Sequence, residues 1–228
     1  MKFISTPFRY LSSFAGEQLI GHYISRVGPD IEVCLINGRY QINAGSVNYS
    51  FGPLHDAFRR YFRRDPPVTE PGAPVLILGF GGGSVAVILR EELELANPIT
   101  GVELDEAMLL AGHEHFGIGR IQDLVIHQMD AFEYILQCTQ KYALIIVDIY
   151  VDDKVPQAFE SLDFIAAVKE CLAPAGKLVF NKLVSDEETA HERMALEDIF
   201  SGIFDQCKTY EIPVCKQSPN CMITGTVD

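Results

Sequence analysis

The chain has 228 residues, of which 48% are hydrophobic and 21% are charged, and its mean hydropathy is +0.12. This composition is typical of a folded globular protein and excludes a disordered chain or a fibre. The 31 acidic residues outnumber the 18 basic ones, giving a net charge of −13. We therefore expect no nucleic-acid partner and no anionic membrane surface, because both would be repelled.

The cysteine and histidine spacings favour neither a disulfide frame nor a metal site. The six cysteines are scattered without a Cys-x-x-Cys pair: Cys34, Cys138, Cys171, Cys207, Cys215 and Cys221. They predict reduced thiols. His113 and His115 lie two apart on a predicted helix, so they point to different faces and no metal is expected. The beginning of the sequence has too short an apolar run for a signal peptide, which predicts a cytoplasmic protein.

Short β-forming runs precede an amphipathic helix in the first part of the chain. The runs lie at 18–27, 31–36 and 39–43. Asn37-Gly38, between the second and third runs, is typical of a tight hairpin turn. Between 52 and 64, apolar residues recur at three- and four-residue intervals, which predicts a helix.

A run rich in proline and glycine at 63–74 cannot be a helix or a central strand. It marks a boundary between two predicted domains. The first, residues 1–65, is a small β-hairpin unit plus a helix, and the second is residues 72–228.

Apolar, β-branched runs alternate with helical stretches after this boundary. The predicted strands lie at 75–78, 100–104, 124–129, 143–149 and 177–183. The predicted helices lie at 84–95, 105–116, 131–140 and 159–172. This alternation predicts a parallel sheet with helices on both faces. A helix at 186–204 and strands at 208–214 and 220–226 predict a terminal hairpin that adds an antiparallel strand.

A glycine-rich turn joins the first predicted strand of the sheet to the helix after it. The sequence there is Leu-Gly-Phe-Gly-Gly-Gly-Ser, at 78–84. Glycines at 79, 81 and 83 allow a tight turn and a close approach of a ligand to the backbone. The absence of Gly-Lys-Ser/Thr disfavours a triphosphate-binding loop. The alternative is a tight turn that binds no ligand.

Acidic residues lie at the ends of the next predicted strands. Glu103, 24 residues after Gly79, is placed to bind the two hydroxyls of a ribose. Asp130 and Asp148 lie at the ends of two further strands, although helix capping is the alternative for Asp130. The same pattern suits a nicotinamide cofactor, but the antiparallel final strand argues against that hypothesis.

These motifs resemble the class I S-adenosylmethionine-dependent methyltransferases, and within them the spermidine synthase (polyamine aminopropyltransferase) branch. The superfamily resemblance covers about 74–228 and rests on the glycine turn together with Val-Glu-Leu-Asp-Glu, Met-Asp-Ala-Phe-Glu-Tyr-Ile, Ile-Ile-Val-Asp and Leu-Ala-Pro-Ala-Gly-Lys-Leu-Val. Ile-Asn-Gly-Arg-Tyr-Gln at 36–41 resembles the Leu-Asp-Gly-x-x-Gln motif of the branch. The resemblance implies a Rossmann-like fold and S-adenosylmethionine, or its decarboxylated form, as cofactor, with no metal.

The resemblance also implies roles for individual residues. The cofactor-binding set is Gly79, Phe80, Gly81, Gly83, Glu103, Leu104, Asp130, Ala131 and Asp148. Glu103 would hold the ribose, Asp130 and the backbone of Ala131 would bind the adenine, and Asp148 would face the reacting group. The catalytic candidates are Asp148 and Asp152.

Two departures from the branch shape the functional hypothesis. Gly82 stands where the branch has an aspartate, and the branch's Asp-x-x-Asp becomes Asp-Ile-Tyr-Val at 148–151, with the acids moved to Asp152 and Asp153. We therefore rank methyl transfer to an unknown small molecule first, because it needs fewer carboxylates.

Aminopropyl transfer to a polyamine is the alternative, and a non-catalytic nucleotide-binding protein is the next. A cationic amine is a candidate substrate, a homodimer is a candidate assembly, and His55 and Asp56 are candidates for a substrate mouth.

Overall fold

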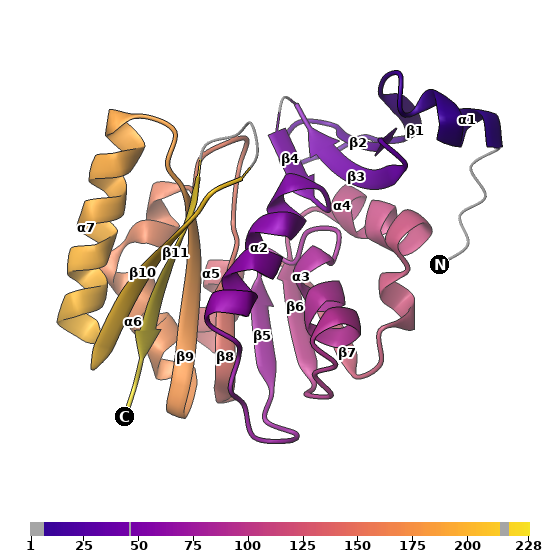
Figure 1. Cartoon of the computed structure of the whole chain (residues 1–228). Helices are drawn as coiled ribbons and strands as arrows, with labels where there is room; N and C mark the ends of the chain where they lie inside the picture. Colours follow the sequence, from indigo (N-terminus) through magenta and orange to yellow (C-terminus); the bar gives the residue numbers. More distant parts are fainter. Residues whose placement is uncertain (1–6, 46, 215–218) are drawn as a thin grey trace.

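The computed structural model describes residues 7–45, 47–214 and 219–228, which form two sheets and the helices around them (Figure 1). The larger sheet has the strand order β10-β11-β9-β8-β5-β6-β7. Its strands are β5 (Val75–Leu78), β6 (Ile99–Glu103), β7 (Leu124–Gln128), β8 (Tyr142–Val147), β9 (Leu172–Leu183), β10 (Gln206–Ile212) and β11 (Asn220–Thr226). β5 to β9 pair in parallel, whereas β11 lies between β9 and β10 and runs antiparallel to both. The predicted Rossmann-like α/β fold is confirmed.

Helices cover both faces of this sheet, as predicted (Figure 1). One face packs against α5 (Ala131–Gln137), α6 (Leu162–Glu170) and α7 (Glu187–Ile203). The other face packs against α2 (Pro53–Arg64) and α3 (Ser84–Val87).

The central strands are buried on both faces because their side chains alternate between these two cores. In β5, Leu76 and Leu78 join the core beneath α5, α6 and α7, whereas Val75 and Ile77 join the core beneath α2 and α3. All four side chains are fully buried. A continuous apolar run is therefore what this strand position requires.

Two of the predicted helices change their hydrogen-bonding pattern along their length. The stretch predicted at 84–95 consists of α3 followed by a π-helical turn, η1 (Ile88–Glu92). The stretch predicted at 105–116 consists of α4 (Glu106–Ala111) followed by a second π-helical turn, η2 (Gly112–Phe116). Apolar periodicity does not distinguish such short π turns from a continuous α-helix. The described residues also include two 3₁₀ turns, η3 (Ile118–Arg120) and η4 (Gln157–Glu160).

A small antiparallel sheet with the order β1-β2-β3-β4 precedes the large one. Its strands are β1 (Gln18–Tyr23), β2 (Ile31–Ile36), β3 (Arg39–Ala44) and β4 (Val47–Ser50), and a short helix, α1 (Pro7–Ser12), precedes them. Asn37 and Gly38 turn between β2 and β3 with φ of 49° and 73°, so the predicted hairpin turn is confirmed. Neither β4 nor α1 was predicted.

The N-terminal sheet and α2 pack against different parts of the large domain. Val33 and Ile42 of the sheet share a core with Ala107 and Met108 of α4. The apolar face of α2, which includes Phe58, packs instead into the core of the large sheet. The division into domains at 1–65 and 72–228 stays a prediction.

The structure also bears on the cysteines and on membrane spans. Five cysteines are free thiols: Cys34, Cys138, Cys171, Cys207 and Cys221. The sixth, Cys215, lies outside the described residues. In the described part of the chain, no helix combines the length and the apolar character needed to cross a bilayer.

Candidate functional site

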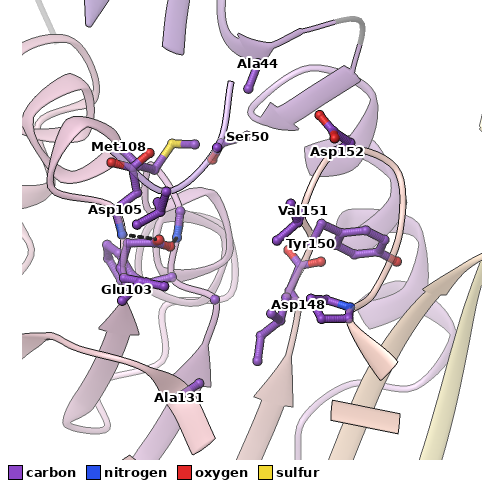
Figure 2. A pocket seen from close by; sticks show the side chains of 18 of the residues that line it. Ala44, Ser50, Glu103, Asp105, Met108, Ala131, Asp148, Tyr150, Val151 and Asp152 are labelled. Atoms are coloured by element: carbon purple, nitrogen blue, oxygen red, sulfur yellow. Dashed lines mark hydrogen bonds between the residues drawn. The ribbon is translucent and has the colours of Figure 1, made fainter. Parts of the chain in front are cut away.

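A cavity of about 790 Å³ lies at the carboxyl ends of the parallel strands, between the large sheet and the N-terminal sheet (Figure 2). Its wall includes the glycine turn after β5, the ends of β6 and β8, the beginning of α5 and the loop after β8. Open α/β sheets bind their ligands at this edge. Of the residues predicted to be catalytic or to bind the cofactor, all line the cavity except Gly83.

The glycine turn is tight enough to require glycine. Gly79, Gly81 and Gly83 have φ of 78°, 57° and 90°, in the left-handed region that favours glycine. A Cβ atom on Gly79 would lie 2.2 Å from the carbonyl oxygen of Asp148. A Cβ atom on Gly83 would lie 2.4 Å from Ile118 Cγ2, so this glycine serves the packing of the turn and not the cavity wall.

Phe80 and Leu104, two predicted cofactor contacts, differ in burial. Phe80 is only 3% exposed and its ring covers Gly101 of β6, where a Cβ atom would lie 2.3 Å from the ring. Leu104 is 47% exposed at the end of β6. The Phe80 side chain therefore closes the turn against the sheet, whereas Leu104 offers an apolar surface to the cavity.

Glu103, at the end of β6, binds the turn with both carboxylate oxygens. Oε2 accepts a hydrogen bond from the backbone N–H of Gly81 at 2.7 Å, and Oε1 accepts one from Asp105 at 2.9 Å (Figure 2). Burial raises the pKa of Glu103, although these backbone hydrogen bonds counteract the rise. A further backbone hydrogen bond, from Leu104, also lowers this pKa. A carboxylate offers about four acceptor sites, so one stays available for a ribose hydroxyl.

Asp130 caps α5, as the helix-capping alternative predicts. Its Oδ1 accepts hydrogen bonds from the backbone N–H groups of Phe132 at 2.7 Å and Glu133 at 3.0 Å. Within the described residues, its Oδ2 has no hydrogen-bond partner, and both Asp130 and Ala131 line the cavity. Capping and ligand binding are thus compatible, because each uses a different oxygen.

Asp148 follows β8 and begins a chain of polar side chains across three strands. Its Oδ1 accepts a hydrogen bond from Asn181 of β9 at 2.9 Å, and Asn181 Oδ1 accepts one from Asn220 of β11 at 2.9 Å. Burial raises the pKa of Asp148 to about 7, the hydrogen bond from Asn181 lowers it, and the charge of Glu103 raises it further. Sequence reasoning missed both asparagines, although an asparagine inside an apolar strand was a usable signal.

Tyr150 ties the loop after β8 to the neighbouring strand. Its hydroxyl donates to the carbonyl of Asn181 at 3.0 Å and accepts from the N–H of Leu183 at 2.8 Å. Asp152 lies in the turn beyond it, with φ of 55° and an exposed side chain. Figure 2 shows Asp152 at the tip of this loop and Asp148 at its base. The two predicted catalytic acids therefore line one cavity at different depths.

The charged side chains described in the cavity wall are all acidic. Its six carboxylates belong to Glu103, Asp105, Asp130, Asp148, Asp152 and Asp153. Among the described residues that line it, there is no lysine, arginine or histidine. Such a wall attracts cationic ligands and repels carboxylates and phosphates.

The structure explains why glycine replaces the expected aspartate at position 82. A Cβ atom on Gly82 would lie 2.3 Å from Ile42 Cδ1 and 3.2 Å from Ser50 Oγ. Ile42 is fully buried in the N-terminal sheet. This sheet therefore fills the space that a side chain at 82 would need.

His55 and Asp56, the candidates for a substrate mouth, line a smaller neighbouring pocket of about 460 Å³ instead. His55 Nδ1 lies 2.8 Å from Ser84 Oγ, and its Nε2 lies 2.8 Å from Glu92 Oε1. Burial lowers the pKa of His55. Only Ser84 of these residues reaches the wall of the large cavity.

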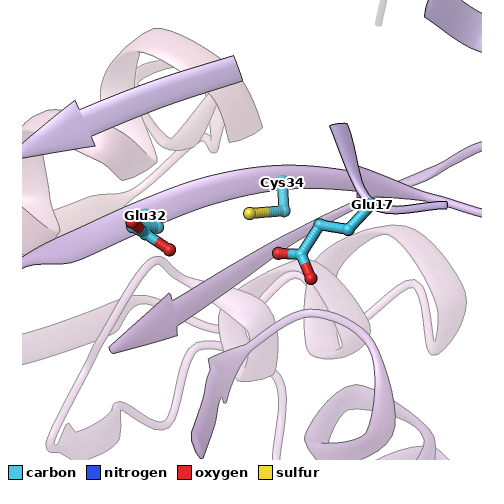
Figure 3. Close-up of side chains that lie close together, drawn as sticks. All are labelled: Glu17, Glu32 and Cys34. Carbon is cyan, nitrogen blue, oxygen red and sulfur yellow. The ribbon is translucent and has the colours of Figure 1, made fainter. Parts of the chain in front are cut away.

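One group of possible metal ligands lies away from the cavity, on the N-terminal sheet (Figure 3). The ligand atoms of Glu17, Glu32 and Cys34 lie within 4.8 Å of one another. Burial and a hydrogen bond with Glu17 raise the pKa of Cys34 to about 12, so the thiol is protonated. The prediction that no metal takes part in the chemistry of the cavity stays a prediction.

Known proteins resemble this chain in sequence and in fold. A "Probable polyamine aminopropyl transferase" of Bifidobacterium longum (strain NCC 2705) is 29% identical over 144 residues, covering 63% of this chain. The chain spans only 32% of that relative's length.

Solved structures resemble the fold. A probable spermidine synthase from Corynebacterium glutamicum ATCC 13032 superposes with a TM-score of 0.75 and 19% identity, over 92% of this chain and 80% of that one. Human Methyltransferase-like protein 13, solved in complex with SAH, superposes with a TM-score of 0.59 and 20% identity, over 77% of this chain and 79% of that one. A family model described as the spermine/spermidine synthase domain matches residues 67–226, and the chain therefore belongs to this family.

Proposed function

We propose that the chain is an aminopropyltransferase that moves the aminopropyl group of decarboxylated S-adenosylmethionine to an amine. The observation that carries this proposal is the cavity wall, with six carboxylates and, within the described residues, no basic side chain. S-adenosylmethionine would place its own carboxylate beside these acids, whereas its decarboxylated form carries only positive charges. Two unit charges ~4 Å apart interact by about 4 kcal/mol at an effective dielectric constant of 20, so the wall discriminates between the two donors.

The strand ends supply the nucleoside-binding part of the site. Glu103 has an acceptor position left for a ribose hydroxyl, and Asp130 Oδ2 is available for the adenine amino group. Gly79 and Gly81 have no side chain, so their backbone atoms line the cavity next to Asp148. The donor's reacting end would thus lie near the Asp148 carboxyl group.

Asp148 is the proton acceptor in this proposal. The sulfonium of the bound donor supplies an activated carbon and a thioether leaving group. The acceptor amine must lose a proton to attack, and a carboxylate whose pKa is raised to about 7 can accept that proton at neutral pH. The new N–C bond forms as the C–S bond breaks, and methylthioadenosine leaves. Asp152, at the rim, would bind the distant ammonium of a diamine.

Aminopropyl transfer now ranks above methyl transfer, reversing the order that the sequence suggested. The family match favours it, and the displaced acids Asp152 and Asp153 still line the cavity. The acidic wall also disfavours a nicotinamide dinucleotide, whose diphosphate would be repelled. Methyl transfer and a non-catalytic role stay as outcomes of the test. A homodimer and a cytoplasmic location stay predictions.

The test is a direct product analysis. The protein is incubated with decarboxylated S-adenosylmethionine and a panel of amines (putrescine, cadaverine, spermidine), and aminopropylated product and methylthioadenosine are measured by mass spectrometry. We expect both products in equal amounts, and far less of both with the Asp148→Asn variant. A parallel incubation with S-adenosylmethionine that gave a methylated amine, with no aminopropylated product from the first incubation, would overturn the proposal.

A further inference from the structure

The hydrogen bonds around His55 connect an outer pocket to the wall of the large cavity. They run from Glu92 of η1 through His55 of α2 to Ser84, the first residue of α3. The His55 side chain is 16% exposed, and Phe51 stacks on its ring at 5.5 Å. Ser84 is 3% exposed and lines the cavity. Three separate segments therefore hold one hydroxyl in place.

The protonation of this chain follows from its acidic end. The pKa of Glu92 is lowered, because hydrogen bonds from His55 and Arg59 outweigh the effect of burial. Its carboxylate can only accept hydrogen bonds, so His55 Nε2 must carry a proton. Burial lowers the pKa of His55, so the ring is neutral and its Nδ1 is an acceptor. The proton of the Ser84 hydroxyl must then point to Nδ1.

This orientation leaves the Ser84 oxygen able only to accept. A hydroxyl has one proton and two lone pairs, and the proton is already donated to His55. Elsewhere in the described part of the chain, Ser84 Oγ has no side-chain hydrogen bond. An acceptor in a cavity with acidic walls suits an N–H donor, and an ammonium group is the donor that those walls attract.

We propose that the Ser84 hydroxyl, oriented by His55 and Glu92, accepts a hydrogen bond from an ammonium group of the ligand in the large cavity. The choice of ligand rests on the proposed function, and the geometry of the hydroxyl does not. Ser84 is a ligand-binding residue in this proposal, and His55 is a positioning residue that acts through it.

The test compares two nucleosides of which only one carries an ammonium group. Decarboxylated S-adenosylmethionine has an aminopropyl ammonium and a sulfonium, whereas methylthioadenosine is a neutral thioether. A sulfonium donates no hydrogen bond, so a hydrogen bond to Ser84 Oγ requires the ammonium. Calorimetric titration is done in mildly alkaline buffer with the wild type, Ser84→Ala and the exposed-site control Ser201→Ala. We expect Ser84→Ala to lower the affinity for the cationic ligand about tenfold, and the affinity for methylthioadenosine less than about twofold. Equal weakening of both ligands, or of neither, would overturn the proposal.

A double-mutant cycle tests the positioning role of His55. His55→Phe keeps the ring and its stacking on Phe51 but removes both nitrogens, so the hydroxyl loses its fixed orientation. We expect His55→Phe alone to lower the affinity for the cationic ligand. In the Ser84→Ala background, the same substitution should cause no further loss of affinity. Additive effects would overturn the positioning role.

The pH dependence gives an independent readout. The charged and titratable groups that line the small pocket with His55 are Arg39, Asp56, Arg59, Glu92, Tyr10 and Tyr40. Protonation of His55 makes Nδ1 a donor and frees the Ser84 proton. The affinity for the cationic ligand should therefore decrease as the pH is lowered, and it should decrease more steeply in the wild type than in His55→Phe. Equal slopes would overturn the proposal. If no aminopropyl transfer occurs but Ser84→Ala still discriminates between the two nucleosides, the proposed function falls and this inference stands.

Discussion

The two walls of the cavity are built in different ways. On the side of the large sheet, the ends of β6, β7 and β8 each deliver an acid whose oxygens are held by backbone N–H groups or by an asparagine, as for Glu103 and Asp148. On the side of the N-terminal unit, the described lining is mainly apolar and includes Pro29, Ile31 and Ala44. The sheet side fixes where charges lie, and the N-terminal side sets the shape of the space.

Replacing the proposed base should have the largest effect. Asp148→Asn keeps the hydrogen-bonding shape but removes the proton acceptor, so we expect the rate of aminopropyl transfer to fall by between about a hundredfold and ten-thousandfold. Binding of methylthioadenosine should change little, because this variant leaves Glu103 and Asp130 intact. Steady-state kinetics and calorimetry measure the two effects, and a variant with full activity would contradict the role of Asp148.

The same residue should also make stability depend on pH. The pKa of Asp148 is raised from 3.8 to about 7 in the folded protein, so the folded state binds more protons between these values. The stability from this group is fully present below pH 3.8 and is lost as pH rises through about 7. Denaturant unfolding should show this slope in the wild type and a weaker one in Asp148→Asn; identical slopes would contradict the shift.

Changing the glycine turn tests how rigid the sheet side is. Gly79→Ala introduces a Cβ atom 2.2 Å from the carbonyl oxygen of Asp148 at a φ of 78°, and we expect a loss of at least about 3 kcal/mol in the free energy of unfolding. Gly72→Ala is the matched control, because Gly72 has φ of 81° with no atom within 4 Å of a Cβ. The control should lose only about 1 kcal/mol. Similar losses in the two variants would mean that backbone strain at positive φ, and not the clash with Asp148, accounts for the loss of stability.

Replacing the predicted ribose ligand should have a smaller effect. Glu103→Gln turns one acceptor into an amide donor facing a backbone N–H, either of Gly81 or of Asp105. We expect the affinity for methylthioadenosine to fall about tenfold in calorimetry. The neighbouring Glu106, which is exposed at the beginning of α4, provides the control Glu106→Gln. Unchanged affinity would rule out Glu103 as a ligand of the nucleoside.

The smallest effect should come from the contact between the two walls. Gly82→Ala places a methyl group against Ile42 Cδ1, the far end of a side chain, which we expect to cost about 1 kcal/mol. Ile42→Val removes that atom at a cost of about 1 kcal/mol. The double variant should be more stable than the sum predicts, as measured by denaturant unfolding. Additive losses of stability would show that the N-terminal sheet moves to accommodate a side chain at position 82.

Sequence reasoning predicted the features that follow from local patterns, and it missed the contacts between segments that are distant in the sequence. Strand runs, the glycine turn and Glu103 follow from local patterns. The partners of Asp148 do not, because Asn181 is 33 residues away from it and Asn220 is a further 39. The contact between Ile42 and Gly82 was equally invisible, since Ile42 lies in the N-terminal sheet and Gly82 in the turn after β5. The fold was therefore predictable, whereas the supports of the site required the structure.

The position of β11 has a consequence for how the cavity forms. β11 follows every other strand in the sequence, yet it hydrogen-bonds to neighbours on both sides and carries Asn220, which supports Asn181 behind Asp148. During synthesis on the ribosome, β9 and β10 emerge before the strand that separates them. The proposed base would therefore gain its full support only after nearly all of this sequence has been translated.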